Sequence, residues 1–158
     1  MPITFFTSPE LDLVVGRWSG QVTTQEILAN IATYVTDAHY RPGRPELNDL
    51  SRVVDIDIDF DRLRGLIQQV NRLEPERHEE TFASIWAPGD AAFAAARMYQ
   101  QLIDFQGGMT LDIFRDQHDA LAAHGLTEQS VETLLEAYEF HPPTRLSGEN
   151  SSTANVTG

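Results

Sequence analysis

Aspartates at alternate positions make residues 55–61 the segment whose residue types and spacing most suggest chemistry. They are Asp55, Asp57, Asp59 and Asp61. An extended backbone would direct all four carboxylates to one side, because side chains alternate between the two faces of a strand. Carboxylates bind calcium in EF-hand loops, which also require glycine at position six and glutamate at position twelve. Counted from Asp55, those positions hold Phe60 and Leu66, so the segment does not match a calcium loop.

Helix capping accounts for the same aspartates without a bound ion. Asp59 precedes an amphipathic stretch and is suited to accept a hydrogen bond from a free backbone amide at the start of a helix. Asp61 would then lie in the first turn, where the helix dipole favours a negative charge. The pattern favours this interpretation, with the other carboxylates in solvent. We keep Asp55, Asp57, Asp59 and Asp61 as candidate residues for binding a protein partner.

The histidines are scattered along the chain, at His39, His78, His118, His124 and His141. No two of them form the His-x-x-x-His pair that places two metal ligands on one helical face, so we expect surface histidines and no metal site. No cysteine is present to act as a nucleophile or thiolate ligand. Glycine-rich phosphate loops and the Gly-x-Ser-x-Gly elbow are also absent. The sequence predicts neither a catalytic centre nor a cofactor.

The overall charge restricts the classes of partner. The 158 residues carry 24 acidic and 11 basic side chains, giving a formal net charge of −13. Such a charge repels nucleic-acid phosphates and anionic lipid headgroups, so neither nucleic acid nor membrane is expected as a partner. We see no secretion signal at the N-terminus and no apolar stretch near the ~20 residues that span a bilayer. The expected location is the cytoplasm.

The N-terminal third predicts a hairpin followed by a helix. Apolar segments at residues 3–6 and 11–18 are separated by a short polar turn, which is typical of two antiparallel strands. We expect Gly20 to close the second strand. Thr23 and Glu26 then have the spacing of a capping box, which predicts a helix start.

Strand and helix patterns alternate through the rest of the chain. The expected elements are a short strand at 46–50, a helix ending before Pro75, a strand at 82–87, a helix with Asp90 as its N-cap that stops at 107–108, a strand at 109–114, a short helix capped by Asp116, and a helix starting at Thr127. This alternation predicts an α/β fold with parallel strands, to which the hairpin adds an antiparallel edge.

We expect a single domain over residues 1–141 and a flexible tail over residues 142–158. The tail is rich in proline, serine, threonine, asparagine and glycine, and its only large aliphatic residues are Leu146 and Val156. It therefore has too little apolar surface to offset the entropy lost on ordering.

The chain resembles the SpoIIAA-like branch of the STAS superfamily in the order of its elements and in three local patterns, at residues 44–51, 86–90 and 113–116. These patterns read Arg-Pro-Glu-Leu-Asn-Asp-Leu-Ser, Trp-Ala-Pro-Gly-Asp and Ile-Phe-Arg-Asp. The likeness covers about residues 16–125, and its most specific part is the stretch at 92–102. The resemblance implies a four- to five-stranded mixed sheet, helices packed mainly on one side, and a regulatory or binding role without catalysis.

Some proteins of this superfamily are switched by phosphorylation of a serine at the start of the helix after the Asp-Leu-Ser-like strand. The corresponding region here, residues 55–59, reads Asp-Ile-Asp-Ile-Asp and has no hydroxyl. This departure argues against a phosphorylation switch. Ser51 lies nearby, but we expect it at the end of a strand and do not assign it as a phosphosite.

Two functional hypotheses remain. The first is a non-catalytic interaction module that meets a protein partner of unknown identity through residues 55–61 and the adjoining helix face. The alternative is a carrier or sensor of a small apolar or lipid-like ligand, because SEC14-like sequences are grouped with this branch. A pocket beneath the second and third helices would favour the alternative. An exposed sheet edge would also allow a homodimer.

Overall fold

Strands β1 (Ile3–Ser8) and β2 (Leu13–Thr23) form an N-terminal antiparallel hairpin in the computed structural model, which describes residues 2–75, 81–106 and 109–143. The predicted hairpin is confirmed. Its strands are longer than expected, because pairing continues past the apolar segments, to Ser8 in β1 and to Thr23 in β2.

Gly20 does not close β2, contrary to the prediction. The strand continues to Thr23, and Gly20 instead adopts a φ of +71° next to a shift in the register between β2 and the following strand. Glycine adopts this left-handed backbone conformation without a steric penalty, which makes it suitable for a bulge. The glycine therefore bends the strand and does not end it.

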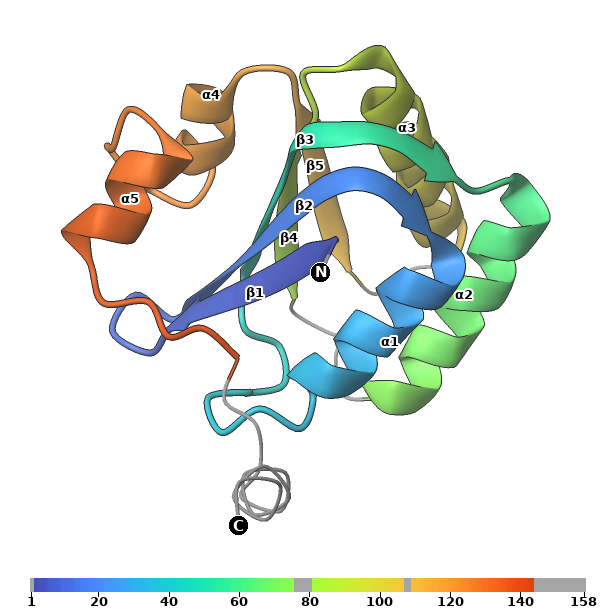
Figure 1. Cartoon of the computed structure of the whole chain (residues 1–158), viewed down its shortest axis with the longest axis horizontal. Coiled ribbons are helices and arrows are strands. Elements are labelled where there is room, and N and C mark those ends of the chain that lie inside the picture. The colour runs from blue at the N-terminus through green and yellow to red at the C-terminus, as the bar shows by residue number, and fades with distance from the viewer. Residues whose placement is uncertain (1, 76–80, 107–108, 144–158) are drawn as a thin grey trace, which may run out of the picture.

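Three further strands complete the sheet: β3 (Glu46–Asp57), β4 (Phe82–Trp86) and β5 (Thr110–Phe114). The strands lie in sequence order across a five-stranded sheet, with β2 to β5 parallel and β1 antiparallel (Figure 1). This mixed α/β sheet confirms the predicted fold class. The strand expected at 46–50 is much longer, because its second half pairs with β2 up to the partners Thr23 and Asp57.

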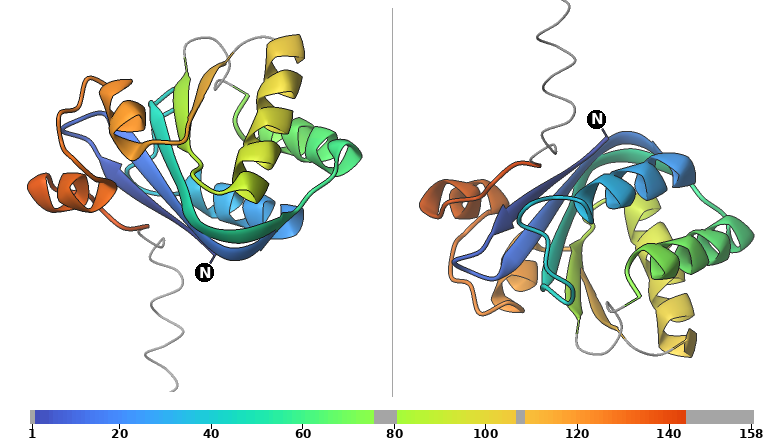
Figure 2. Two further views of the ribbon diagram at one scale, coloured as in Figure 1. Left: turned by 90° about the horizontal axis from the view of Figure 1, so that it is seen from above. Right: turned by 90° about the horizontal axis from the view of Figure 1, so that it is seen from below.

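Helices α1 (Thr24–Tyr34), α2 (Phe60–Leu73) and α3 (Asp90–Gln106) connect the successive parallel strands. Crossovers between parallel strands share one hand, so strands added in sequence order place all their helices on one face. Figure 2 shows α1, α2 and α3 together on that face, with the two shorter C-terminal helices on the other.

The starts of α1 and α3 show how local residues define helix ends. Thr23 is the N-cap of α1 and accepts a hydrogen bond from the Glu26 amide at 3.2 Å, as the capping box predicts. Asp90 is not an N-cap, contrary to the prediction. The carbonyl of Gly89 accepts the first helical hydrogen bond, from Phe93, so Asp90 lies inside the first turn of α3. The stop predicted at 107–108 lies outside the described residues.

Helices α4 (Gln117–Ala122) and α5 (Val131–Ala137) follow β5. The predicted cap at Asp116 is confirmed, but the last helix does not begin at Thr127. Ser130 is its N-cap and accepts a hydrogen bond from the Thr133 amide at 3.1 Å.

After α5 the chain returns to the hairpin. The backbone amide of His141 donates to the carbonyl of Thr7 at 2.7 Å, and the Thr7 amide donates back at 2.9 Å. Residues 144–158, most of the predicted tail, lie outside the described residues, so the division at 141 stays a prediction.

Buried apolar side chains form a core on each face of the sheet. Beneath α1, α2 and α3 they include Ile3, Val22, Ile27, Leu50, Leu63, Ile67, Ala83, Ile85, Ala92, Ala96, Leu102 and Leu111. Beneath α4 and α5 they are Leu13, Val15, Leu47, Ala120, Leu121, Val131 and Leu134. Because side chains alternate along each strand, each face of the sheet has its own buried core, whereas the second half of β3 keeps exposed side chains such as Val54.

Candidate functional site

The structure separates the four candidate aspartates into two pairs. Asp55 and Asp57 lie at the end of β3, whereas Asp59 is the N-cap of α2 and Asp61 lies in the first turn of that helix. The carboxylate of Asp59 accepts a hydrogen bond from the amide of Arg62 at 2.8 Å. The capping interpretation is therefore confirmed: Asp59 keeps an extended backbone as the N-cap, and only Asp61 leaves the extended segment for the helix.

Arg62 forms ion pairs with two carboxylates of this acidic segment. Its Nη1 contacts Oδ1 of Asp57 at 3.0 Å, and its Nε lies 3.7 Å from Oδ2 of Asp59. All three side chains are more than half exposed, and such pairs contribute only about 0–1 kcal/mol. The side chains of Asp55 and Asp61 make no ion pair or hydrogen bond within the described ranges. Most of the negative charge of the segment is thus available to an incoming group.

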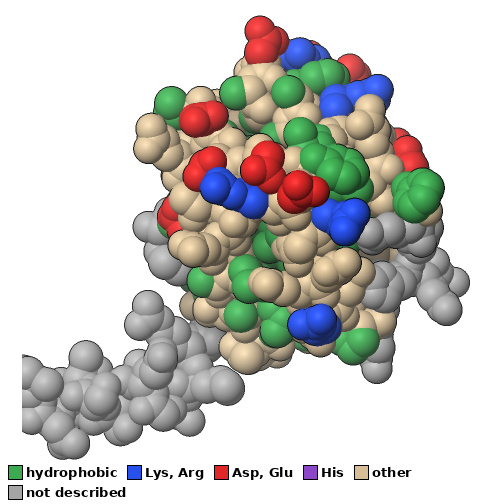
Figure 3. Space-filling model, turned by 90° about the vertical axis from the view of Figure 1, so that its right-hand side faces the viewer, with side chains coloured by type: hydrophobic (Ala, Val, Ile, Leu, Met, Phe, Trp, Pro, Cys, Tyr) green, Lys and Arg blue, Asp and Glu red, His purple; other side chains and the backbone are tan. Residues whose placement is uncertain are grey.

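Two exposed hydrophobic side chains flank these carboxylates. Val54 is 71% exposed and Phe60 is 49% exposed, and only two other large apolar residues of the described chain are comparably exposed. Figure 3 shows the side of the molecule on which α2 and α3 lie, where acidic and arginine side chains interleave with hydrophobic ones. We call the set Val54, Asp55, Asp57, Asp59, Phe60 and Asp61 the acidic surface.

The backbone beneath the acidic surface has an open edge. Strand β4 pairs with β3 only from Glu46 to Asp49. Beyond Asp49, within the described part of the chain, β3 pairs with β2 alone and arches past the shorter strands (Figure 1). Unpaired amides and carbonyls along such an edge are ready to bind an added segment of chain.

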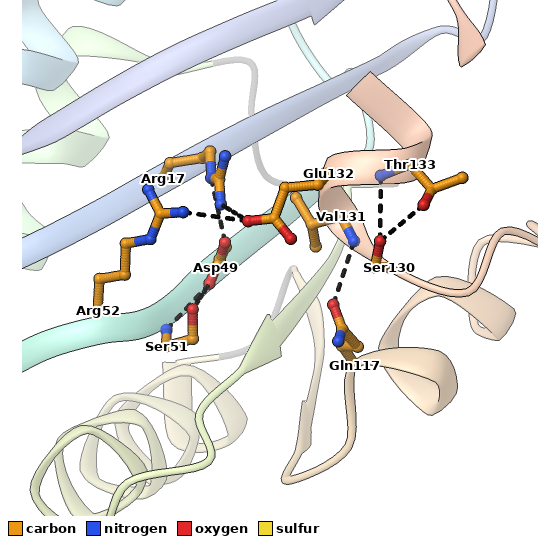
Figure 4. Close-up of polar contacts among 9 residues, drawn as sticks. All are labelled: Arg17, Asp49, Ser51, Arg52, Gln117, Ser130, Val131, Glu132 and Thr133. Carbon is orange, nitrogen blue, oxygen red and sulfur yellow. Dashed lines mark hydrogen bonds and ion pairs between the residues drawn. The ribbon is translucent and has the colours of Figure 1, made fainter. Parts of the chain in front are cut away.

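A polar network of five residues lies on the other side of the sheet, between β2, β3 and α5 (Figure 4). The buried carboxylate of Asp49 accepts hydrogen bonds from the Ser51 amide at 2.9 Å, from the Ser51 hydroxyl at 2.6 Å and from Arg17 Nε at 3.2 Å. Glu132 of α5 then accepts from both Arg17 and Arg52 at 3.0 Å. Ser51 therefore lies inside β3, not at its end, and its hydroxyl holds Asp49.

Ser84 and His124 form the contact that most resembles a catalytic pair. The Ser84 hydroxyl lies 2.7 Å from Nε2 of His124, as in sites where histidine activates a serine nucleophile. Burial lowers the pKa of His124 to about 4, although a hydrogen bond with the Glu46 backbone opposes this shift. Ser84 has no exposed surface, so no substrate reaches its hydroxyl in this conformation. The pair joins β4 to the end of α4.

The expectation of surface histidines is therefore wrong for His124. The strand pattern contains one signal for this contact. Ala83 and Ile85 face α3, so the side chain of Ser84 between them points to the opposite layer, where its hydroxyl meets His124. Two other histidines also contact each other, since the rings of His39 and His141 stack with centroids 4.2 Å apart.

No metal centre and no membrane span emerge from the described residues. Within 2–75, 81–106 and 109–143, no three histidine, aspartate or glutamate side chains lie close enough together to hold an ion. None of the helices in the same ranges is both long and apolar enough to cross a bilayer.

A cavity of about 110 Å³ lies between the sheet and helices α1, α2 and α3. Its wall is mainly apolar and includes Phe5, Trp18, Ile31, Ile56, Ile58, Leu63, Leu66, Ala95 and Tyr99. The amphipathic patterns predict a core in this region but contain no signal for an unfilled space, because a void depends on how side chains from distant segments meet.

No protein-family model and no curated protein matches the chain. Two solved structures are similar to it. One is an uncharacterized protein from the DUF3478 family with a SpoIIAA-like fold, from Shewanella loihica PV-4, at 15% identity and a TM-score of 0.45; the match covers 77% of this chain and 90% of that chain. The other is the anti-sigma factor antagonist SpoIIAA in its unphosphorylated form, at 14% identity and a TM-score of 0.37, covering 68% of this chain and 86% of that chain. The chain is similar to SpoIIAA-like proteins, as its sequence predicts.

Proposed function

We propose that the chain is a non-catalytic regulatory module that binds a basic protein partner through the acidic surface. The observation that carries the proposal is the exposure of Val54 and Phe60 beside the unpartnered carboxylates of Asp55 and Asp61. Apolar side chains with charged neighbours are typical of surfaces that become buried on binding.

Each part of the acidic surface has a separate role in this proposal. Phe60 and Val54 supply apolar area that loses contact with water in the complex, which favours association by roughly 25 cal/mol per Å². The carboxylates attract arginine and lysine side chains and raise the rate of encounter. A basic partner with a shallow apolar pocket is complementary to both features.

The absence of catalysis is part of the proposal, and burial supports it. The Ser84–His124 pair has the residue types of a nucleophile and base, but the serine is enclosed. A phosphorylation switch at the start of α2 is not part of the proposal, because the carboxylate of Asp59 already caps the helix there by accepting from the amide of Arg62.

Site-specific photocrosslinking tests where the partner binds. The photoreactive residue p-benzoylphenylalanine replaces Val54 in one variant and Glu136, an exposed residue of α5, in the control. We expect a discrete crosslinked protein from extracts of the native host at position 54 and none at position 136. Mass spectrometry then identifies this protein, and the purified partner is used for titration.

Charge reversal at Asp55 tests how the partner is recognised. Asp55→Arg should weaken binding of the purified partner about tenfold or more, whereas Glu136→Arg, with the same change in net charge, should have little effect. Asp59 is unsuitable for this test because its loss also removes a helix cap. Equal crosslinking at both positions, or equal affinity of the two reversal variants, would contradict the proposal.

A further inference from the structure

The cavity between the sheet and α1–α3 has the size of a small-molecule site. Its volume of about 110 Å³ is somewhat below the ~150 Å³ of an engineered protein cavity that binds benzene. The cavity also opens partly to solvent, so a bound molecule can enter and can extend beyond it. This volume suits an apolar group of about four to six carbon atoms and is far too small for a lipid.

Two glutamates line one end of the cavity. Glu46, at the start of β3, and Glu74, directly after α2, both line it, and so does Tyr34 at the end of α1. Burial raises the pKa of Tyr34, and the two glutamates raise it further, which shows that their carboxylates act on the phenol oxygen. The hydroxyl of Tyr40 donates to Glu74 at 3.2 Å.

Helix ends add to the negative potential at the same place. The C-terminal ends of α1 and α2 lie at Tyr34 and Leu73, and a helix carries partial negative charge at its C-terminus. Arg44 is a cation that acts on Tyr34 with the opposite sign. Its Nη1 donates to the carboxylate of Asp12 at 2.8 Å, and Arg41 contacts the same carboxylate, so Asp12 offsets only part of the charge of Arg44.

We propose that this cavity binds a small apolar molecule that ends in a primary ammonium group. The apolar body would lie against Leu63, Leu66 and Ala95, and the ammonium group would lie at the end formed by Glu46 and Glu74. An ammonium group offers three donors to carboxylate and phenol acceptors, which a neutral or anionic head group cannot match. This site is separate from the acidic surface and does not rest on the proposed function.

Trp18 provides a direct reporter of occupancy because it lines the cavity and donates from Nε1 to Asn48 at 3.1 Å. The second tryptophan, Trp86, does not line the cavity, so Trp86→Phe leaves a single reporter. Fluorescence titrations of this variant use n-pentylamine, 1-pentanol and butanoate, which are similar in size and differ in charge. We expect saturable binding of pentylamine, about tenfold tighter than pentanol, and no saturation with butanoate.

Two pairs of variants locate the site. Glu74→Gln keeps the shape of the side chain and should weaken pentylamine about tenfold while leaving pentanol unchanged; Glu136→Gln makes the same change in charge on the other face and should have no effect. Ala95→Leu should fill the cavity and abolish binding of both pentylamine and pentanol. Ala94 is the adjacent, exposed residue of α3, and Ala94→Leu should leave the binding of both unchanged.

Circular dichroism confirms folding of each variant before titration, and Ala95→Leu tests the site independently if Glu74→Gln is unfolded. Pentylamine that binds no tighter than pentanol would overturn the assignment of an ammonium group. Absence of saturable binding, or affinity that Ala95→Leu leaves unchanged, would overturn the cavity as the site.

Discussion

At the scale of single residues, His124 shows how burial changes the chemistry of a side chain. Its ring packs against Phe82 with centroids 4.9 Å apart, and its Nε2 lies 2.7 Å from the hydroxyl of Ser84. In a neutral ring, Nε2 can accept a hydrogen bond from that hydroxyl. Protonation would replace this acceptor with a donor and leave a charge in a poorly hydrated place, so the folded state favours the neutral form.

His124 should therefore make the stability of the protein depend on pH. The pKa falls from 6.5 in the unfolded chain to about 4 in the folded protein, so the unfolded chain binds more protons between these values. Stability is full above pH about 6.5 and decreases as the pH falls toward 4, by up to about 3 kcal/mol. Urea unfolding at a series of pH values measures this loss.

The variant His124→Gln separates the effect of this imidazole from that of the many carboxylates. Its glutamine keeps polar atoms near Ser84 but does not titrate. Between pH 6.5 and 5 the variant should lose clearly less stability than the unchanged protein. If both lost the same amount, another group would be responsible for the pH dependence.

At the scale of elements, a polar network links α5 to the sheet through one exposed carboxylate on the helix and one buried carboxylate in β3. Asp49 is 1% exposed and accepts three hydrogen bonds within the sheet, whereas Glu132 is 58% exposed and bridges two arginines at the surface (Figure 4). The two residues share Arg17, so they belong to one network but differ in their access to solvent.

Removing these carboxylates should have unequal effects on stability. Asp49→Ala leaves Arg17 and the Ser51 donors without their buried acceptor, which should cost about 3–5 kcal/mol. Glu132→Ala removes two solvent-screened pairs and should cost less than about 1 kcal/mol. Denaturant unfolding of both variants gives the comparison. Similar losses would mean that the network is not organised around the buried carboxylate.

Helix starts were easier to predict than strand ends. The caps at Thr23, Asp59 and Asp116 depend on residues only a few positions apart, and the sequence identifies all three. The start of α5 at Val131 was missed because it also depends on a distant side chain, Gln117, whose Oε1 accepts from the Val131 amide at 3.1 Å. The extension of β3 to Asp57 likewise depends on β2, through pairing that a local polar pattern cannot show.

At the scale of the whole molecule, the two proposed sites occupy opposite sides of one segment. Ile56 and Ile58 line the cavity, whereas Asp57 between them is 69% exposed at its side chain and belongs to the acidic surface. The sequence predicts the exposed aspartates from their alternation with isoleucine. It does not predict the cavity, whose polar end joins residues from the ends of α1 and α2 and the start of β3.

The excess of acidic groups also sets how the folded molecule responds to salt. A net charge of −13, with arginine as the only basic residue besides histidine, leaves many like charges close together in the compact state. Salt at ~1 M reduces the Debye length to ~3 Å and screens this repulsion more in the folded protein than in the expanded chain. Raising sodium chloride from ~10 mM to ~1 M should therefore raise Tm by about 3–6 °C.

Neutralising three exposed acidic side chains provides the control for this effect. The triple variant Asp55→Asn, Asp61→Asn and Glu136→Gln should show a smaller rise in Tm with sodium chloride, because less repulsion remains to be screened. Sucrose stabilises proteins without screening charge and should raise Tm equally in both proteins. A salt response of the same size in the triple variant would attribute the stabilisation to general salt effects on hydration. Salt screens attractive ion pairs as well as repulsion between like charges. A fall in Tm with salt would therefore show that ion pairs stabilise the folded protein more than like-charge repulsion destabilises it.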